Sequence, residues 1–326
     1  MKNNTLILFM ALSMTTALSA AALPEVAVPA ADASAFTAGD VSSELVSLFQ
    51  AGDELSEKEV SELQRLYVIF VPGFLSNVVT EPSQVIEQDK GLPKLSGYFS
   101  QQVVFLRSLG VQCGIADIES QSSTEQNART LRKIIRSSEK KVLLIAHSKG
   151  GLDSLEALLE EPGLRANVAG VITIQSPFFG SPVADLVLSN SVTSYPSQKL
   201  LAALGGTKQS LVDLSSSIRK DYQAKNRAGI EKLTAGVPFL CVTTYKQRGL
   251  IPYDTLLEVF RDYMLLLGLQ NDGMVPAQRG MLPGSRYAVL GGVDHLATVM
   301  SVPVPSFDRV RFLKALLKLR LQNPPR

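Results

Sequence analysis

Only two histidines occur in the chain of 326 residues, His147 and His295. Histidine is the side chain that exchanges protons near neutral pH, so chemistry that needs an imidazole has two possible positions. The chain also has only two cysteines, and this scarcity argues against a metal site rich in His and Cys. The composition, with 45% hydrophobic residues, 19% charged residues and a formal net charge of +2, is that of a globular protein. It excludes a disordered chain and argues against a nucleic-acid binder, which would be more basic.

A serine beside the first histidine occupies a position typical of a nucleophile. Residues 142–151 read VLLIAHSKGG, a buried-strand pattern that runs through Ser148 directly into a helix. Two small residues, Ala146 and Gly150, stand two positions before and two positions after the serine. This pattern predicts a nucleophile elbow, although Ala146 departs from the usual first glycine. The alternative is an ordinary strand-to-helix turn that contains a serine by chance.

Five segments, in this order, carry a resemblance to a known family. They are residues 70–74 (FVPGF), 146–151 (AHSKGG), 176–185 (SPFFGSPVAD), 271–275 (NDGMV) and 294–295 (DH). On these segments the chain resembles the α/β-hydrolase superfamily over about residues 66–321. More narrowly, it is similar to the secreted bacterial triacylglycerol lipases.

The serine needs a base, because a free alcohol is a weak nucleophile. His147 adjoins Ser148, but neighbouring side chains at a strand end point to opposite faces, so we expect His147 to point away. His295 follows a predicted strand, as the base of the superfamily does, and is therefore the expected base. The alternative for His295 is a chance histidine of the core or the surface.

A carboxylate must orient the imidazole and stabilise its charged form. Asp272 lies in an Asn-Asp-Gly segment that resembles the acid site of the lipases. The order Ser148, Asp272, His295 is that of the α/β-hydrolases. Asp294 is the rival because it adjoins His295, but adjacent side chains diverge, which favours a turn or supporting role. Two further rivals are weaker, Asp254 and Asp262.

The resemblance also implies two backbone N–H donors for the oxyanion that forms during acyl transfer. One is the amide of Lys149, which follows the serine, and the other is the amide of Phe74 in the loop after the first strand. Lipase relatives commonly carry His-Gly in that loop, where this chain has Pro72 and Gly73. Pro72 can hold the loop but offers no side-chain hydrogen bond.

From residue 66 onward, short apolar runs alternate with helical patterns. The runs read as strands at 66–71, 111–115, 142–146, 168–174, 237–243 and 287–290. The helical patterns lie at 95–109, 124–137, 152–160 and 307–321. Strands that are apolar throughout are covered on both faces. The sequence therefore predicts an α/β fold with a mostly parallel central sheet and helices on both faces.

Two segments precede the predicted hydrolase domain, residues 66–326. Residues 1–22 combine a short positive start, an apolar core and small residues, which predicts a cleaved signal peptide, with a membrane anchor as the alternative. Residues 23–65 form a lead-in that is partly helical, because Ser56 and Glu59 have the spacing of a capping box.

A helical insert is expected at about residues 183–268, with helical patterns at 197–204 and 254–269. In lipase relatives this region forms a lid over an acyl pocket. Apolar surface on a movable helix would suit transient contact with a lipid interface. The alternative is that these leucines simply cover the sheet.

The resemblance argues against a metal ion and against a disulfide. Some lipases of this kind hold calcium through an Asp two residues after the base, where this chain has Ala297, so we expect no such site and no cofactor. The superfamily strand order would place Cys113 and Cys241 four strands apart, roughly 19 Å at about 4.8 Å per strand. A disulfide needs Cα atoms within about 7 Å, so we expect two buried free cysteines.

Together these patterns predict a secreted or periplasmic serine carboxylester hydrolase, a lipase or esterase that forms an acyl-enzyme on Ser148. Phospholipase, polyester depolymerase and acyltransferase activities are alternatives that would use the same triad. A non-catalytic binding protein of the α/β-hydrolase fold is an alternative from another class. The presence of Ser, Asp and His in order argues against it.

Overall fold

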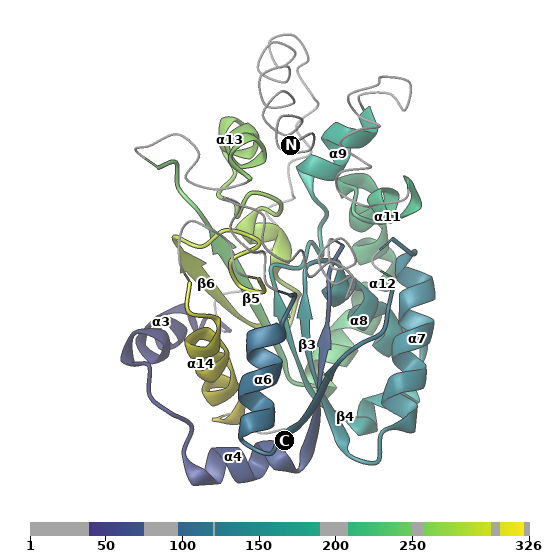
Figure 1. The fold of residues 1–326 in the computed structure, drawn as a ribbon. Coiled ribbons are helices and arrows are strands. Elements are labelled where there is room, and N and C mark those ends of the chain that lie inside the picture. Colours follow the sequence, from purple (N-terminus) through teal and green to yellow (C-terminus); the bar gives the residue numbers. More distant parts are fainter. Residues whose placement is uncertain are drawn as a thin grey trace, which may run out of the picture.

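The structure is a computed structural model that describes residues 39–74, 97–119, 121–189, 208–249, 257–300 and 307–322 (Figure 1). The predicted signal peptide at 1–22, the helical pattern at 197–204 and Asp254 lie outside the described residues. Within the described ranges, no helix has the length and apolar character needed to cross a bilayer.

Six parallel strands form one sheet in the order β2-β1-β3-β4-β5-β6. They are β1 (Leu66–Val71), β2 (Gln112–Ile115), β3 (Lys141–His147), β4 (Val168–Ile174), β5 (Phe239–Tyr245) and β6 (Arg286–Gly291). All the predicted strands are confirmed, with small differences at their ends. Because the strands are parallel, their carboxyl ends meet at one edge of the sheet, and the loops that follow β1, β3, β4, β5 and β6 can converge there.

Helices cover both faces of the sheet, as predicted (Figure 1). One face carries α3 (Ser42–Ala51), α6 (Ser100–Ser108) and α14 (Arg309–Leu321). The other face carries α7 (Thr124–Ser137), α8 (Lys149–Glu160) and α12 (Ser216–Gly236). The short helices α9 (Pro182–Ser189), α11 (Lys208–Asp213) and α13 (Glu258–Leu266) lie beyond one end of the sheet (Figure 1).

Alternate residues of the central strands supply the two hydrophobic cores. On β3, Leu143 and Ile145 join the core beneath α3, α6 and α14, whereas Leu144 and Ala146 join the core beneath α7, α8 and α12. All four are almost fully buried. This period of two, apolar on both faces, is why the strands read as continuous apolar runs in the sequence.

The described part of the lead-in packs on the domain. The predicted capping box is present at the start of α4 (Glu57–Gln64): the Glu59 amide donates to Ser56 Oγ, and the Ser56 amide donates to the Glu59 carboxylate at 2.7 Å. Leu45 of α3 is fully buried in the core that α14 also lines. The main chain of Val41 pairs with that of Tyr287 on β6 at 2.8 Å, which ties the lead-in to the sheet.

The helical insert predicted at 183–268 is not one continuous segment. This range also contains α12, which packs on α8, and β5, which lies inside the sheet. The short helices at the end of the sheet therefore come from two separate stretches, α9 with α11 and then α13. The sequence pattern does not predict α12, because four of its buried residues, Ser216, Arg219, Gln223 and Thr234, are polar or charged and so leave no clear apolar stripe.

The two cysteines are buried and free, as predicted. Cys113 lies on the edge strand β2 and Cys241 on β5, with β1, β3 and β4 between them. That separation exceeds the reach of a disulfide.

Candidate active site

The turn between β3 and α8 has the strained geometry of a nucleophile elbow. Ser148 has φ 53° and ψ −128°, a conformation that costs a non-glycine residue about 1–3 kcal/mol. Its amide donates to the carbonyl of Ile174 at the end of β4 at 2.9 Å, which fixes the turn against the neighbouring strand. A Cβ on Gly150 would lie 2.4 Å from the carbonyl oxygen of Val71, so only glycine lets α8 approach β1 this closely.

The three residues predicted to act together are adjacent in space. His295 Nε2 lies 3.0 Å from Ser148 Oγ, and His295 Nδ1 lies 2.8 Å from Asp272 Oδ2. A carboxylate only accepts hydrogen bonds, so Nδ1 carries the proton and Nε2 has a lone pair directed at the serine hydroxyl. Ser148, His295 and Asp272 are all buried, which strengthens their electrostatic interactions.

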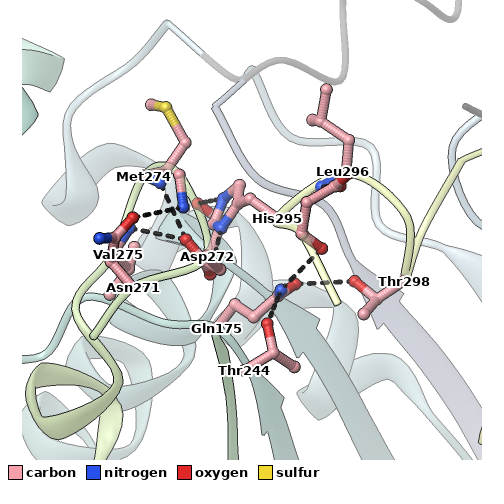
Figure 2. Close-up of polar contacts among 12 residues, drawn as sticks. Gln175, Thr244, Asn271, Asp272, Met274, Val275, His295, Leu296 and Thr298 are labelled. Atoms are coloured by element: carbon pink, nitrogen blue, oxygen red, sulfur yellow. Dashed lines mark hydrogen bonds and ion pairs between the residues drawn. The ribbon is translucent and has the colours of Figure 1, made fainter. Parts of the chain in front are cut away.

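The loop that presents Asp272 is built from backbone hydrogen bonds (Figure 2). Asp272 Oδ1 accepts from the amides of Met274 and Val275, both at 2.8 Å, which leaves Oδ2 for the imidazole. Gly273 has φ 101°, a region that favours glycine, and its amide donates to the Asn271 side chain. The main chain of His295 is held to the same loop, since its amide donates to the carbonyl of Asp272 at 2.9 Å.

The rival carboxylates have other roles. Asp294 Oδ1 accepts from the amides of Leu296 and Ala297, both at 2.9 Å, and so shapes the turn after the histidine. Asp262 lies on α13 and pairs with Arg248 at 2.6 Å. The carboxylate that contacts His295 Nδ1 is that of Asp272.

The loop after β1 lies against the serine on the other side. A Cβ on Gly73 would lie 2.7 Å from Ser148 Cβ, which shows how closely the two segments approach. Phe74, the next residue, is buried and lines the same cavity as the serine. Lys149 is the first residue of α8, where helix amides lack intrahelical partners. Both predicted oxyanion donors therefore belong to segments that adjoin the serine.

The expectation that His147 points away from Ser148 does not include where its ring packs instead. His147 makes no hydrogen bond to Ser148 among the described residues, but its ring packs on the ring of His295 with centroids 4.6 Å apart. Burial, and then the nearby His295, hold the pKa of His147 well below its ordinary value, so the ring is neutral. The alternation rule described the strand correctly, but it did not foresee that the base loop folds back over this face.

A buried ion pair involves Lys149, the residue that follows the serine. Lys149 Nζ contacts Asp153 Oδ1 at 2.9 Å, and both side chains are 1% exposed. Asn127 on α7 donates to the same carboxylate at 2.9 Å. The lysine side chain thus points into the protein body, where it pairs with Asp153.

An apolar cavity opens at Ser148 and His295. It is bordered mainly by carbon atoms from α9, from the region of α11 and from the loops around the site. The apolar lining residues are Phe74, Pro177, Val183, Ala184, Val187, Leu211, Leu214, Met274, Val275 and Leu296. In the described part of the chain, no group of three or more His, Cys, Asp and Glu side chains is placed to hold a metal ion.

Two polar residues of the site were missed in the sequence. Tyr98 contacts His147, and Gln175 contacts both His147 and the base loop. Gln175 offered one signal, since it is a polar residue at the carboxyl end of a fully buried strand. Tyr98 offered none, because its partners lie far away in the sequence.

Solved structures with this architecture include a metagenomic carboxyl esterase, with a TM-score of 0.62 and 22% identity over 79% of this chain and 76% of that one. A mature lipase of Bacillus licheniformis gives a TM-score of 0.52 and 22% identity over 70% of this chain and 84% of that one. Lipase 1 of Pelosinus fermentans gives 0.50 and 13% identity, over 80% and 99%. No protein-family model matches the sequence, and no curated protein matches it significantly. The chain has the α/β-hydrolase fold, as predicted. Because identities this low establish the fold alone, the activity must be argued from the site.

Proposed function

We propose that this chain is a serine carboxylester hydrolase, a lipase or esterase that acts through an acyl-enzyme on Ser148. One observation carries the proposal: the buried chain of contacts from Ser148 Oγ to His295 at 3.0 Å and from His295 to Asp272 at 2.8 Å. It is the arrangement that converts a weakly nucleophilic alcohol into an attacking group.

In the proposed reaction, Ser148 Oγ attacks the ester carbonyl carbon while His295 Nε2 takes the hydroxyl proton. Asp272 keeps the ring in the required tautomer and stabilises the imidazolium. His295 then gives the proton to the leaving alcohol, and the acyl group stays on Ser148. A water molecule, deprotonated by the same nitrogen, attacks the acyl-enzyme and releases the acid.

The carbonyl oxygen becomes negatively charged during the attack. In this proposal the backbone amides of Phe74 and Lys149 stabilise that oxyanion by donating hydrogen bonds to it. Preorganised donors act where charge develops, and one such donor is typically worth about 10²–10³ in rate. Both assignments are supported by the position of Gly73 and Phe74 against Ser148 and by the location of Lys149 at the first turn of α8. A side-chain substitution of Lys149 would leave its amide in place.

The apolar cavity supports an acyl group rich in CH₂ as the substrate moiety. We also propose that the protein contacts a lipid interface. Two exposed leucines at the end of α13 support this contact: Leu266 is 77% exposed and Leu267 is 46% exposed. The double substitution Leu266→Asp and Leu267→Asp should lower activity on emulsified triacylglycerol and leave activity on soluble p-nitrophenyl butyrate unchanged. Equal activity of both proteins on the emulsion would remove the interface from the proposal.

The central experiment is a chain-length series of p-nitrophenyl esters, from acetate to palmitate, combined with labelling by a fluorophosphonate. Wild type should hydrolyse the esters and be labelled on Ser148, whereas Ser148→Ala and His295→Ala should do neither. Ser176→Ala is the matched control, because Ser176 is buried beside Gly151 and its Oγ has no hydrogen-bond partner among the described residues.

The outcomes separate the candidate functions. Absence of turnover and labelling in wild type would favour the non-catalytic binding protein. Activity confined to short chains would keep the esterase and discard the lipase. Labelling of Ser148 with turnover only when an alcohol acceptor is added would favour an acyltransferase.

Secretion or export to the periplasm is proposed from residues 1–22 alone. N-terminal sequencing of the protein recovered from the culture medium or the periplasm tests it. A mature N-terminus near residue 22 is expected, and a full-length protein retained in the membrane fraction would contradict it.

A further inference from the structure

A chain of hydrogen bonds joins the two loops on either side of the proposed nucleophile. The Gly73 amide donates to Tyr98 Oη at 3.1 Å, and Tyr98 Oη contacts His147 Nδ1. On the other edge of the ring, His147 Nε2 lies 2.9 Å from the main-chain carbonyl oxygen of His295. A carbonyl only accepts, so His147 Nε2 carries the proton and Nδ1 accepts from the Tyr98 hydroxyl.

Gln175 extends this chain along the base loop (Figure 2). Its Oε1 accepts from His147 Nε2 at 3.0 Å and from the Thr298 hydroxyl at 2.8 Å. Its Nε2 donates to the carbonyl of Asp294 at 3.0 Å and to the hydroxyl of Thr244 on β5. The amide group therefore uses both its oxygen and its nitrogen in four contacts.

The backbone of Gln175 is held in an uncommon conformation. Its φ is 56°, a left-handed value that few residues other than glycine, Asn and Asp adopt. Its amide donates to the carbonyl of Val242 at 2.7 Å. Such strain persists only where the surroundings over-determine it, and here it aims the side chain across the ends of β4 and β5 at the base loop.

The network is uncharged throughout. Burial holds the pKa of Tyr98 above its ordinary value and the pKa of His147 well below its own. The remaining members are an amide and two threonine hydroxyls, none of which titrates, and every member is 2% exposed or less. The directions of these hydrogen bonds therefore do not depend on a change of charge within the network.

We propose that Tyr98, His147 and Gln175 are positioning residues, which hold the base loop through the carbonyls of Asp294 and His295 and hold the oxyanion loop through the amide of Gly73. The proposal rests on the proposed function, in which His295 is the base and Phe74 supplies an oxyanion donor. His295 is then fixed on both sides of its Cα, since its own amide donates to Asp272 and its carbonyl accepts from His147.

The first test removes one hydroxyl. Tyr98→Phe leaves the Gly73 amide and His147 Nδ1 without their partner, so kcat for p-nitrophenyl butyrate should fall about 10-fold or more, with KM nearly unchanged. Tyr222→Phe is the matched control, because Tyr222 donates to Glu156 on the far face of α8. Its kcat should stay within about twofold of wild type. Equal kcat for both variants and wild type would overturn the proposal.

A second pair of variants uses neighbouring residues of β5. Thr244 accepts from Gln175, whereas Thr243 Oγ1 has no hydrogen-bond partner among the described residues, and both residues are 1% exposed. Thr244→Val should lower kcat, and Thr243→Val should not. If kcat falls in both variants in proportion to the decrease in their melting temperatures, the network has only a structural role.

The two histidines allow a readout that needs no turnover. The chain has two histidines, so nitrogen-15 NMR spectra contain signals from two imidazole rings. The spectrum of His147→Asn shows which signals belong to His295. We expect one neutral ring, protonated on Nε2, that stays neutral at a pH at which a free imidazole is protonated. We expect Tyr98→Phe, but not Tyr222→Phe, to shift the signals of His295.

This readout distinguishes two failures. If wild type hydrolyses no ester, the proposed function fails, while the His295 shift still decides whether the network holds that residue. Unchanged His295 signals in Tyr98→Phe would overturn the positioning role even in an active enzyme.

Discussion

Two buried carboxylates are linked to the nucleophile turn, each through a nitrogen-bearing side chain. Asp272 contacts His295 at 2.8 Å, and Asp153 contacts Lys149 at 2.9 Å. All four side chains are 4% exposed or less. Only His295 also reaches Ser148 Oγ, so proximity of opposite groups does not by itself mark a chemical role.

The two carboxylates differ in the groups that donate hydrogen bonds to them. Asp272 accepts from two backbone amides of its own turn. Asp153 instead accepts from the side chains of Lys149 and Asn127. Burial raises the pKa of Asp153 to about 6, because desolvation outweighs the attraction of Lys149. A carboxylate held by backbone amides keeps its partners whatever side chains surround it, whereas Asp153 depends on two other residues.

The largest expected effect is on the Asp272 side. Asp272→Asn keeps the two backbone hydrogen bonds but offers an amide to His295, which favours the wrong tautomer, and kcat should fall about 10⁴-fold. Asp294→Asn is the control, since it keeps one oxygen for the amides of Leu296 and Ala297. A larger loss of kcat in Asp294→Asn would transfer the proposed acid role to that residue.

On the Asp153 side the expected effect is on stability. Lys149→Met leaves a buried carboxylate unpaired, so the free energy of unfolding in urea should fall by about 3–5 kcal/mol. The double variant Lys149→Met with Asp153→Leu should recover most of that loss. Because the proposed oxyanion donor is the amide of Lys149, kcat of the folded variants should change little. A loss of kcat as large as that of Asp272→Asn would show that the two pairs are not different in kind.

A smaller effect is expected from the third partner of Asp153. Asn127→Ala removes a side-chain hydrogen bond to the carboxylate, which should cost about 1.5–3 kcal/mol in the free energy of unfolding and leave kcat unchanged. Asn226→Ala is a suitable control, because Asn226 donates to a carbonyl of its own helix and is only partly buried. Equal losses in the two variants would contradict the special status of the Asp153 pair.

The last expected effect is a difference in pH dependence. The folded-state pKa of Asp153, about 6, lies above the 3.8 of a free aspartate, so between these values the folded protein binds more protons than the unfolded one. Stability contributed by this group is therefore present below about pH 4 and is lost as the pH rises to about 6. Wild type should lose stability relative to Asp153→Asn across this interval in urea titrations. A constant difference would mean that Lys149 compensates the burial of the carboxylate fully.

The strands and the elbow were predictable because their signals are local. Apolar runs of suitable length mark buried strands, and a serine between such a run and a helix with glycines marks the turn. The helices outside the sheet were less predictable. Helix α12 buries mostly polar side chains, so no apolar stripe marks it in the sequence. The apolar run at 237–243 predicts a strand, but the pairing of β5 with β4 and β6 shows that this strand divides the expected insert.

The sequence indicated Ser148 and His295 through the elbow pattern and the presence of only two histidines, and it indicated Asp272 through the resemblance of its Asn-Asp-Gly segment to the acid site of the lipases. The pair of Lys149 and Asp153 is likewise local, at a helical spacing of four residues. Only the tertiary structure decided that Tyr98, His147 and Gln175 meet. Their contacts join segments that follow separate strands. Parallel strands bring their carboxyl ends to one edge of the sheet, whatever the length of chain between them, so spacing in the sequence does not show which of these segments meet.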